Sequence, residues 1–115
     1  IQQRERIEQL RRFQLSFDKF SKLAIVAKNE KVIFLSTPFD IESALFLNKI
    51  VPAYKISSGD NDFQPLIEVI AKTGKPIIMS TGLINLDEVK KSVLLIKNIW
   101  EEKDIKQVAN LINKF

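Results

Sequence analysis

Hydroxyl side chains follow three short apolar runs at regular spacing along the chain. The first run ends in Ser36-Thr37, the second in Ser57-Ser58 and the third in Ser80-Thr81. Parallel α/β folds bind their ligands at the carboxyl ends of the strands, where such hydroxyls can contact an anion. A single pair is equally well explained by helix capping or turn hydrogen bonds. Three pairs in succession favour ligand contact.

Two charged residues accompany the second hydroxyl pair. Lys55 lies within the apolar run 53–56, where a lysine needs a partner to be tolerated. We therefore favour an anion-binding role over a side chain that reaches to solvent. Asp60 follows Ser-Ser-Gly and suits either ligand contact or capping of the next helix equally well. A Schiff-base aldolase that uses Lys55 is a less favoured alternative, which borohydride trapping of a pyruvate adduct would test.

The apolar runs predict buried strands at 32–39, 53–56 and 76–79, because short runs of Val, Ile and Phe suit strands covered on both faces. Helical patterns follow at 40–48, at 63–73 and from Asn85, where the apolar residues are Leu86, Val89, Val93 and Ile96. Asp40 is an expected N-cap, as is Asn85 or a residue beside it, Gly74 is an expected stop, and Ser16 opens an earlier helix. This alternation predicts parallel strands with right-handed crossovers, as in a (β/α)₈ barrel or a doubly wound sheet.

The final stretch departs from the alternation. The charged segment 101–104 is followed by four apolar residues at helical spacing: Ile105, Val108, Leu111 and Ile112. No apolar run that could form a strand precedes them. We therefore divide the chain into an α/β part at 1–99 and an atypical amphipathic helix at 100–115. Self-association through this helix would use Trp100, Leu111 and Phe115.

Composition excludes several function classes. The net charge of +4 comes from 18 basic and 14 acidic residues in interleaved order, which indicates solvated helix faces and not a nucleic-acid surface. The chain has no Cys and no His, so no disulfide, thiolate site or histidine base is available from it. No apolar run reaches the length of a membrane span. We expect a soluble, cytoplasmic protein.

Three linked motifs resemble one enzyme family. They are F-L-S-T-P-F-D at 34–40, P-A-Y-K-I-S-S-G-D at 52–60 and T-G-K-P-I-I-M-S-T-G at 73–82. Together, and in this order, they resemble the N-acetylneuraminate (sialic acid) synthase family. The resemblance implies three consecutive βα units of an incomplete (β/α)₈ barrel. It also implies condensation of phosphoenolpyruvate with N-acetylmannosamine or a related amino sugar, in which enol carbon three attacks the aldehyde, water adds at carbon two and phosphate leaves.

The resemblance also assigns roles to individual residues. It places Lys55 against the phosphate or carboxylate of phosphoenolpyruvate, as a point charge suits. It gives substrate contacts to Thr37, Ser58 and Ser80, and a place in the pocket wall to Phe39, for which core packing is an equal alternative. Asp60 occupies an acidic position that contacts the sugar or transfers a proton. Glutamate is frequent there, and aspartate is one methylene shorter.

Other parts of the family pattern are absent from this sequence. The family holds a divalent metal, Mn²⁺ or Mg²⁺, with histidines, and this chain has none. The first-strand motif, a second lysine and the later His-Cys-Thr-Ser motif are also missing. We therefore expect the chain alone to be inactive, and a non-catalytic remnant that acts through self-association is the alternative. The sequence does not identify the amino sugar.

Overall fold

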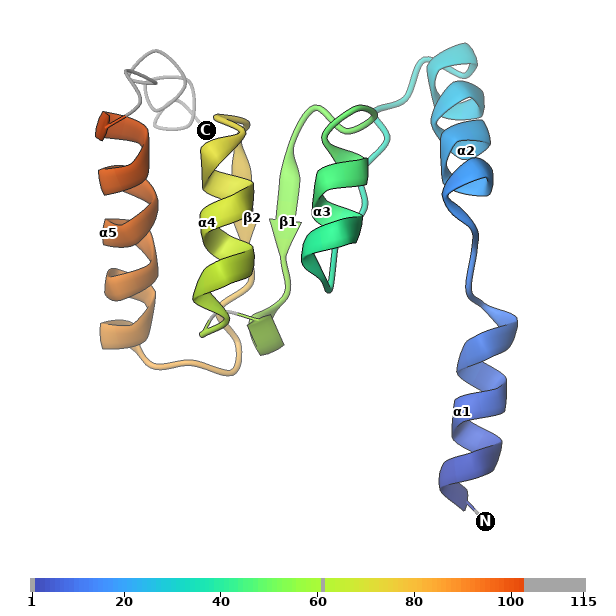
Figure 1. Ribbon diagram of the computed structural model, residues 1–115, viewed down its shortest axis with the longest axis horizontal. Coiled ribbons are helices and arrows are strands. Elements are labelled where there is room, and N and C mark those ends of the chain that lie inside the picture. The colour runs from blue at the N-terminus through green and yellow to red at the C-terminus, as the bar shows by residue number, and fades with distance from the viewer. Residues whose placement is uncertain (1, 61, 103–115) are drawn as a thin grey trace. The chain divides into compact units, whose positions relative to one another are not determined.

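The computed structural model describes residues 2–60 and 62–102, and the chain divides into two compact units, Ile1–Val32 and Ile33–Phe115. The first unit contains the helices α1 (Gln2–Arg12) and α2 (Phe17–Asn29) (Figure 1). Ser16 caps α2, because its hydroxyl accepts a hydrogen bond from the Lys19 N–H at 3.3 Å. The predicted start of this helix is confirmed.

The second unit alternates helices with two strands. Its elements are α3 (Ile41–Leu47), β1 (Tyr54–Ile56), the short 3₁₀ turn η1 (Ser58–Asp60), α4 (Gln64–Lys72), β2 (Ile77–Met79) and α5 (Leu86–Glu102). β1 and β2 pair in parallel, with Lys55 opposite Ile78. The helix α4 connects the two strands and packs between α3 and α5 (Figure 1). The prediction of an α/β fold with parallel strands is confirmed.

Local sequence signals set most of the helix boundaries. The Asp40 carboxylate accepts a hydrogen bond from the Ser43 N–H at 2.7 Å and so caps α3. Asn85 and Glu88 form a reciprocal capping box at the start of α5. Gly74 follows the end of α4 with φ of 73°, a left-handed conformation that glycine adopts without steric cost.

The predicted strand at 32–39 is wrong. Residues 32–38 have no regular secondary structure, and the described chain contains one two-stranded sheet. Ile33 is 77% exposed and Leu35 43% exposed, so this apolar run lacks the covering layers that a strand buried on both faces requires. Phe34 and Pro38 do pack inward. The apolar pattern indicated partial burial here, but not backbone pairing.

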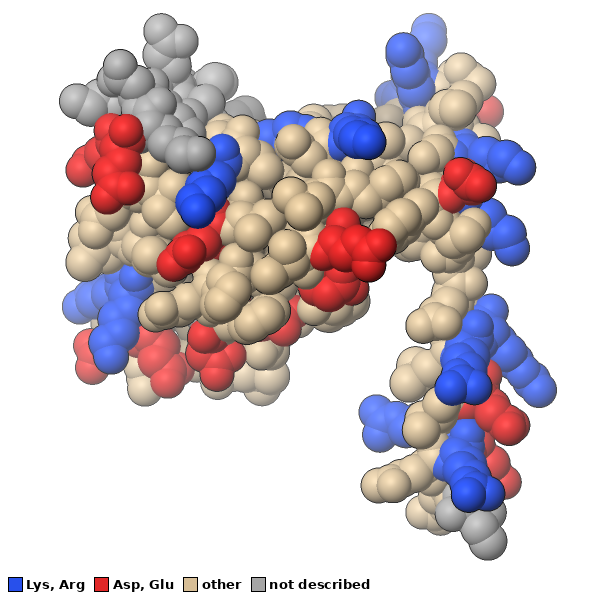
Figure 2. Space-filling model, viewed as in Figure 1, with Lys and Arg blue, Asp and Glu red and all other residues tan. Residues whose placement is uncertain are grey.

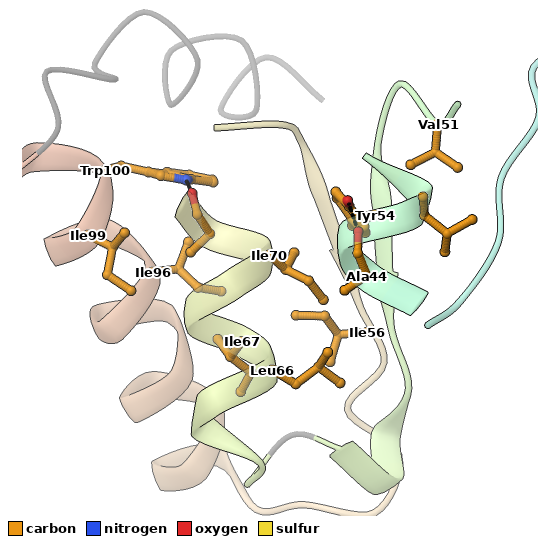
Figure 3. Packing of buried hydrophobic residues seen from close by; sticks show 12 residues of the cluster. Ala44, Val51, Tyr54, Ile56, Leu66, Ile67, Ile70, Ile96, Ile99 and Trp100 are labelled. Atoms are coloured by element: carbon orange, nitrogen blue, oxygen red, sulfur yellow. Dashed lines mark hydrogen bonds between the residues drawn. The ribbon is translucent and has the colours of Figure 1, made fainter. Parts of the chain in front are cut away.

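The core lies between the sheet and its three helices (Figure 3). Tyr54 and Ile56 project from β1 toward α4, whose Leu66, Ile67 and Ile70 are fully buried. Each such apolar side chain stabilises the fold by roughly 1.5–3 kcal/mol through its removal from water. This packing covers one face of the sheet, since the residue between Tyr54 and Ile56 is exposed.

The buried stripe of α5 shares Ile96 with the predicted stripe but otherwise lies further along the helix. Its buried residues are Ser92, Ile96, Ile99 and Trp100, whereas Leu86 is 67% exposed and Val93 41% exposed. The helix continues through Trp100 to Glu102, past the predicted boundary at residue 99. Two of the four predicted contact residues, Leu86 and Val89, lie before the first buried residue, Ser92. The helix predicted within 103–115, with Leu111 and Phe115, lies outside the described residues.

Charges of both signs are interspersed over the helix face of the second unit (Figure 2). This arrangement agrees with the solvated helix faces that the mixed charge order predicted. Among the described residues, no helix is long and apolar enough to cross a membrane.

Candidate functional site

Lys55 occupies the sheet face opposite the helices. The burial pattern of β1 alternates, with Tyr54 and Ile56 buried and Lys55 exposed between them, as expected for side chains that point to opposite faces of a strand. Its partner in the parallel register, Ile78, is 51% exposed. The ammonium group of Lys55 therefore stands beside an apolar neighbour on an open face, with no ion-pair partner among the described residues.

The turn after β1 contains the predicted serine and aspartate. Ser58 and Asp60 are both partly buried in η1, and the Asp60 N–H donates to the Ser57 carbonyl at 3.0 Å. The helix α4 has Phe63 as its N-cap, without a side-chain hydrogen bond. Asp60 therefore does not cap α4, which removes the alternative to ligand contact that the sequence left open.

One carboxylate oxygen of Asp60 lacks a partner. Oδ2 is buried and accepts no hydrogen bond within the part of the chain that the structure describes. A buried carboxylate oxygen without a donor is costly.

The end of β2 lies against the end of β1. The Ser80 N–H donates to the Ile56 carbonyl at 3.0 Å, and the register pairs Ile56 with Met79. Ser80 therefore begins the segment that leaves the sheet beside the turn with Ser58 and Asp60. Ser58, Asp60 and Ser80 thus follow the carboxyl ends of the two strands, and Lys55 lies one residue before the end of β1.

Thr37 and Phe39 lie in the segment just before α3. Thr37 is partly buried, and Phe39 is 68% exposed, so core packing does not explain this phenylalanine. Because residues 32–38 are not a strand, no sheet register ties Thr37 to Lys55. Thr37 is held in the second unit through the buried Pro38 and the helix α3 that follows.

Polar side chains at the opposite, amino end of the strands bind main-chain carbonyls. Lys75 Nζ donates to the carbonyls of Asn48 and Val51, the latter at 2.8 Å, and burial lowers the pKa of Lys75. The Thr73 hydroxyl donates to the Ile70 carbonyl at 2.6 Å. These bonds satisfy carbonyls at or just beyond the ends of α3 and α4, and the sequence analysis did not identify them.

A hollow of about 220 Å³ lies between α4 and α5. Asp62, Glu88 and Lys91 lie around it, together with Ile67 and Leu95. None of the predicted site residues lines it. Within the described residues, no three His, Cys, Asp or Glu side chains converge to hold a metal ion. The donor set present does not fit the metal centre that the family resemblance implied.

The described part of the second unit is a parallel α/β arrangement, and such folds place their ligands at the carboxyl ends of the strands. The NeuB family model matches residues 1–111. The chain belongs to the NeuB family, and the predicted resemblance is confirmed.

Several known proteins are similar to this chain. An N,N'-diacetyllegionaminic acid synthase of Campylobacter jejuni is 37% identical over 101 residues, which cover 86% of this chain and 30% of that protein. An uncharacterized Methanocaldococcus jannaschii protein is 42% identical over 82% of this chain and 28% of its own length. The crystal structure of an N-acetylneuraminic acid synthetase from Leptospira borgpetersenii, in complex with citrate, aligns with a TM-score of 0.72 and 28% identity, covering 75% of this chain and 30% of that one. The chain thus spans less than a third of the length of these relatives.

Proposed function

We propose that this chain contributes consecutive βα units to a (β/α)₈ barrel that condenses phosphoenolpyruvate with an amino sugar to give a nonulosonic acid. Family membership supports the class of reaction, and the observation that supports the site is the position of Lys55. It projects from the sheet face that the helices leave open, which corresponds to the interior of a barrel whose helices lie outside.

In this proposal the residues at the carboxyl end bind the two substrates differently. Lys55 pairs with the phosphate or carboxylate of phosphoenolpyruvate, and the hydroxyls of Thr37, Ser58 and Ser80 donate hydrogen bonds to the same anion. Carbon three of the enol attacks the sugar aldehyde, water adds to carbon two, and inorganic phosphate leaves as the C–O bond breaks. Lys55 stabilises negative charge on the departing phosphate.

Asp60 and Phe39 contact the sugar in the proposed complex. The carboxylate of Asp60, a residue that is only partly buried, accepts a hydrogen bond from a sugar hydroxyl or receives a proton during the reaction. The exposed ring of Phe39 supplies an apolar wall. We assign no step to a divalent metal, because the described residues do not assemble ligands for one.

Binding of phosphoenolpyruvate to the chain tests this proposal more directly than turnover. We expect phosphorus-31 NMR or calorimetry to detect binding that Lys55→Gln weakens roughly tenfold to 100-fold, as for the loss of a charge-assisted contact. Lys72→Gln, at an exposed lysine in the last turn of α4, is the matched control and should bind as the unchanged chain does. Equal binding by both variants would show that Lys55 is not the anion site.

The alternative is a non-catalytic remnant that self-associates through Trp100, Leu111 and Phe115. Trp100 does not support it. Trp100 is 6% exposed, and its indole N–H donates to the Ala71 carbonyl at 2.9 Å. The side chain is therefore occupied within the second unit and does not present a surface for self-association. Light scattering before and after deletion of residues 109–115 tests what remains of that alternative.

A further inference from the structure

The hydroxyl of Tyr54 links two segments that contain candidate site residues. Tyr54 is fully buried in β1, and its hydroxyl donates a hydrogen bond to the Ala44 carbonyl in α3 at 2.5 Å (Figure 3). The Ala44 carbonyl also accepts the Asn48 N–H at 3.2 Å, so the bond from Tyr54 is added to the ordinary helix bond. Burial raises the pKa of Tyr54 to about 12. The phenol therefore remains a donor at neutral pH.

On one side of this bond, α3 fixes the segment with Thr37 and Phe39. Asp40 Oδ1 accepts the Ser43 N–H at 2.7 Å, and Oδ2 accepts the Ser43 hydroxyl at 3.0 Å. Pro38 is fully buried directly after Thr37. The segment is thus anchored to the first turn of α3 at two points, and a movement of α3 would move Thr37 with it.

On the other side of the bond, β1 fixes Lys55. Tyr54 and Lys55 are consecutive and project from opposite faces of the strand. The structure gives residues 32–38 no strand pairing with β1. A hydrogen bond from Tyr54 to α3 therefore replaces, in part, the ladder that would otherwise set the position of Thr37 relative to Lys55.

We propose that Tyr54 is a positioning residue, which sets the spacing between Lys55 and Thr37 through its hydrogen bond to Ala44. The inference rests on the proposed function, because it assumes that both side chains contact one phosphoenolpyruvate molecule. Tyr54 itself faces the core and does not contact the substrate.

The test compares two variants that each lose one hydroxyl bonded to a main-chain carbonyl. Tyr54→Phe removes the bond to Ala44. Thr73→Val, at the opposite end of the strands, removes the bond to Ile70 and also the acceptor of the Lys75 N–H. We expect similar shifts in the urea midpoint for both. Affinity for phosphoenolpyruvate should fall about tenfold in Tyr54→Phe only, in keeping with the usual worth of one hydrogen bond.

A second measurement separates positioning from general loosening of the fold. In a Thr37→Ala background, Tyr54→Phe should have little further effect on affinity, because the contact that it positions is already gone. The inference would be overturned if Tyr54→Phe reduced the affinity for phosphoenolpyruvate equally in the Thr37 and the Thr37→Ala chains. It would also be overturned if the Tyr54→Phe chain bound as tightly as the unchanged one. A Tyr54→Phe chain that does not fold, beside a folded Thr73→Val chain, would also overturn it. If the unchanged chain binds no phosphoenolpyruvate, the proposed function itself fails.

Discussion

The two ends of the strands in the second unit use polar side chains in opposite ways. At the amino end, Lys75 and Thr73 donate to main-chain carbonyls at the ends of neighbouring helices, and Trp100 does the same for α4. At the carboxyl end, Lys55 has no ion-pair partner among the described residues, and Asp60 leaves a buried oxygen without a donor. The polar side chains at the amino end thus bind main-chain carbonyls of the same chain. At the carboxyl end, the Lys55 ammonium group and one Asp60 oxygen have no such partner among the described residues.

The two ends of the strands have different roles in parallel α/β folds. Residues at the amino ends of such strands stabilise the fold, and residues at the carboxyl ends bind ligands. Side chains that are bonded to their own chain cannot rearrange around a substrate without losing those bonds. The following predictions test whether the two ends can be altered independently, from the largest expected effect to the smallest.

Removal of Trp100 should cause the greatest loss of stability. Trp100→Ala deletes a buried ring and its hydrogen bond to Ala71, and such substitutions cost roughly 3–5 kcal/mol. Urea unfolding followed by circular dichroism would measure this cost. A loss below about 1 kcal/mol would show that α5 contributes little to the second unit.

Alkaline pH should destabilise the chain through Tyr54. The unfolded phenol loses its proton near its ordinary pKa of 10, whereas burial raises the pKa of Tyr54 to about 12. The contribution of this group is complete below pH 10 and declines as pH rises toward 12, by roughly 2–3 kcal/mol at most. The difference in unfolding free energy between the chain and Tyr54→Phe should shrink over this interval. Tyr54 is the one tyrosine in the sequence, so absorbance at alkaline pH reports its titration directly.

Loss of the Lys75 ammonium group should weaken the amino end selectively. Lys75→Met retains the apolar stem but leaves the carbonyls of Asn48 and Val51 without their donor, which should cost about 1–3 kcal/mol. Urea unfolding measures the loss, and Lys72→Met is the matched control. Affinity for phosphoenolpyruvate should not change once the protein is folded. A parallel loss of affinity would mean that the two ends are coupled.

Neutralisation of Asp60 should have the smallest effect on stability, and it should stabilise the chain where the preceding changes destabilise it. Asp60→Asn removes a charge from a buried oxygen without a partner, so unfolding free energy should rise by up to about 1 kcal/mol. Binding of the amino sugar should weaken at the same time. Asp87→Asn, in the exposed first turn of α5, is the control. A destabilised Asp60→Asn chain would identify the aspartate as a structural residue.

Local signals explain most of what was predictable. The caps at Ser16, Asp40 and Asn85 and the stop at Gly74 act over three or four residues, so the sequence alone shows where those helices begin and end. The three linked motifs, including the one around Lys55, predicted the family, and the site at the carboxyl ends of the strands stays a prediction. The strand at 32–39 was not predictable in this way, because a strand needs a hydrogen-bonded neighbour and periodicity does not show one.

By itself, the sequence determined the alternation of helices and strands from Ile41 onward and the membership in the NeuB family. These features depend on short motifs and on the order of apolar residues. Only the tertiary structure decided that Lys55 faces away from the helices, that Asp60 retains an unbonded oxygen and that Tyr54 joins β1 to α3. Those facts depend on contacts between residues distant in the chain or on the burial that packing produces, which local propensity does not encode.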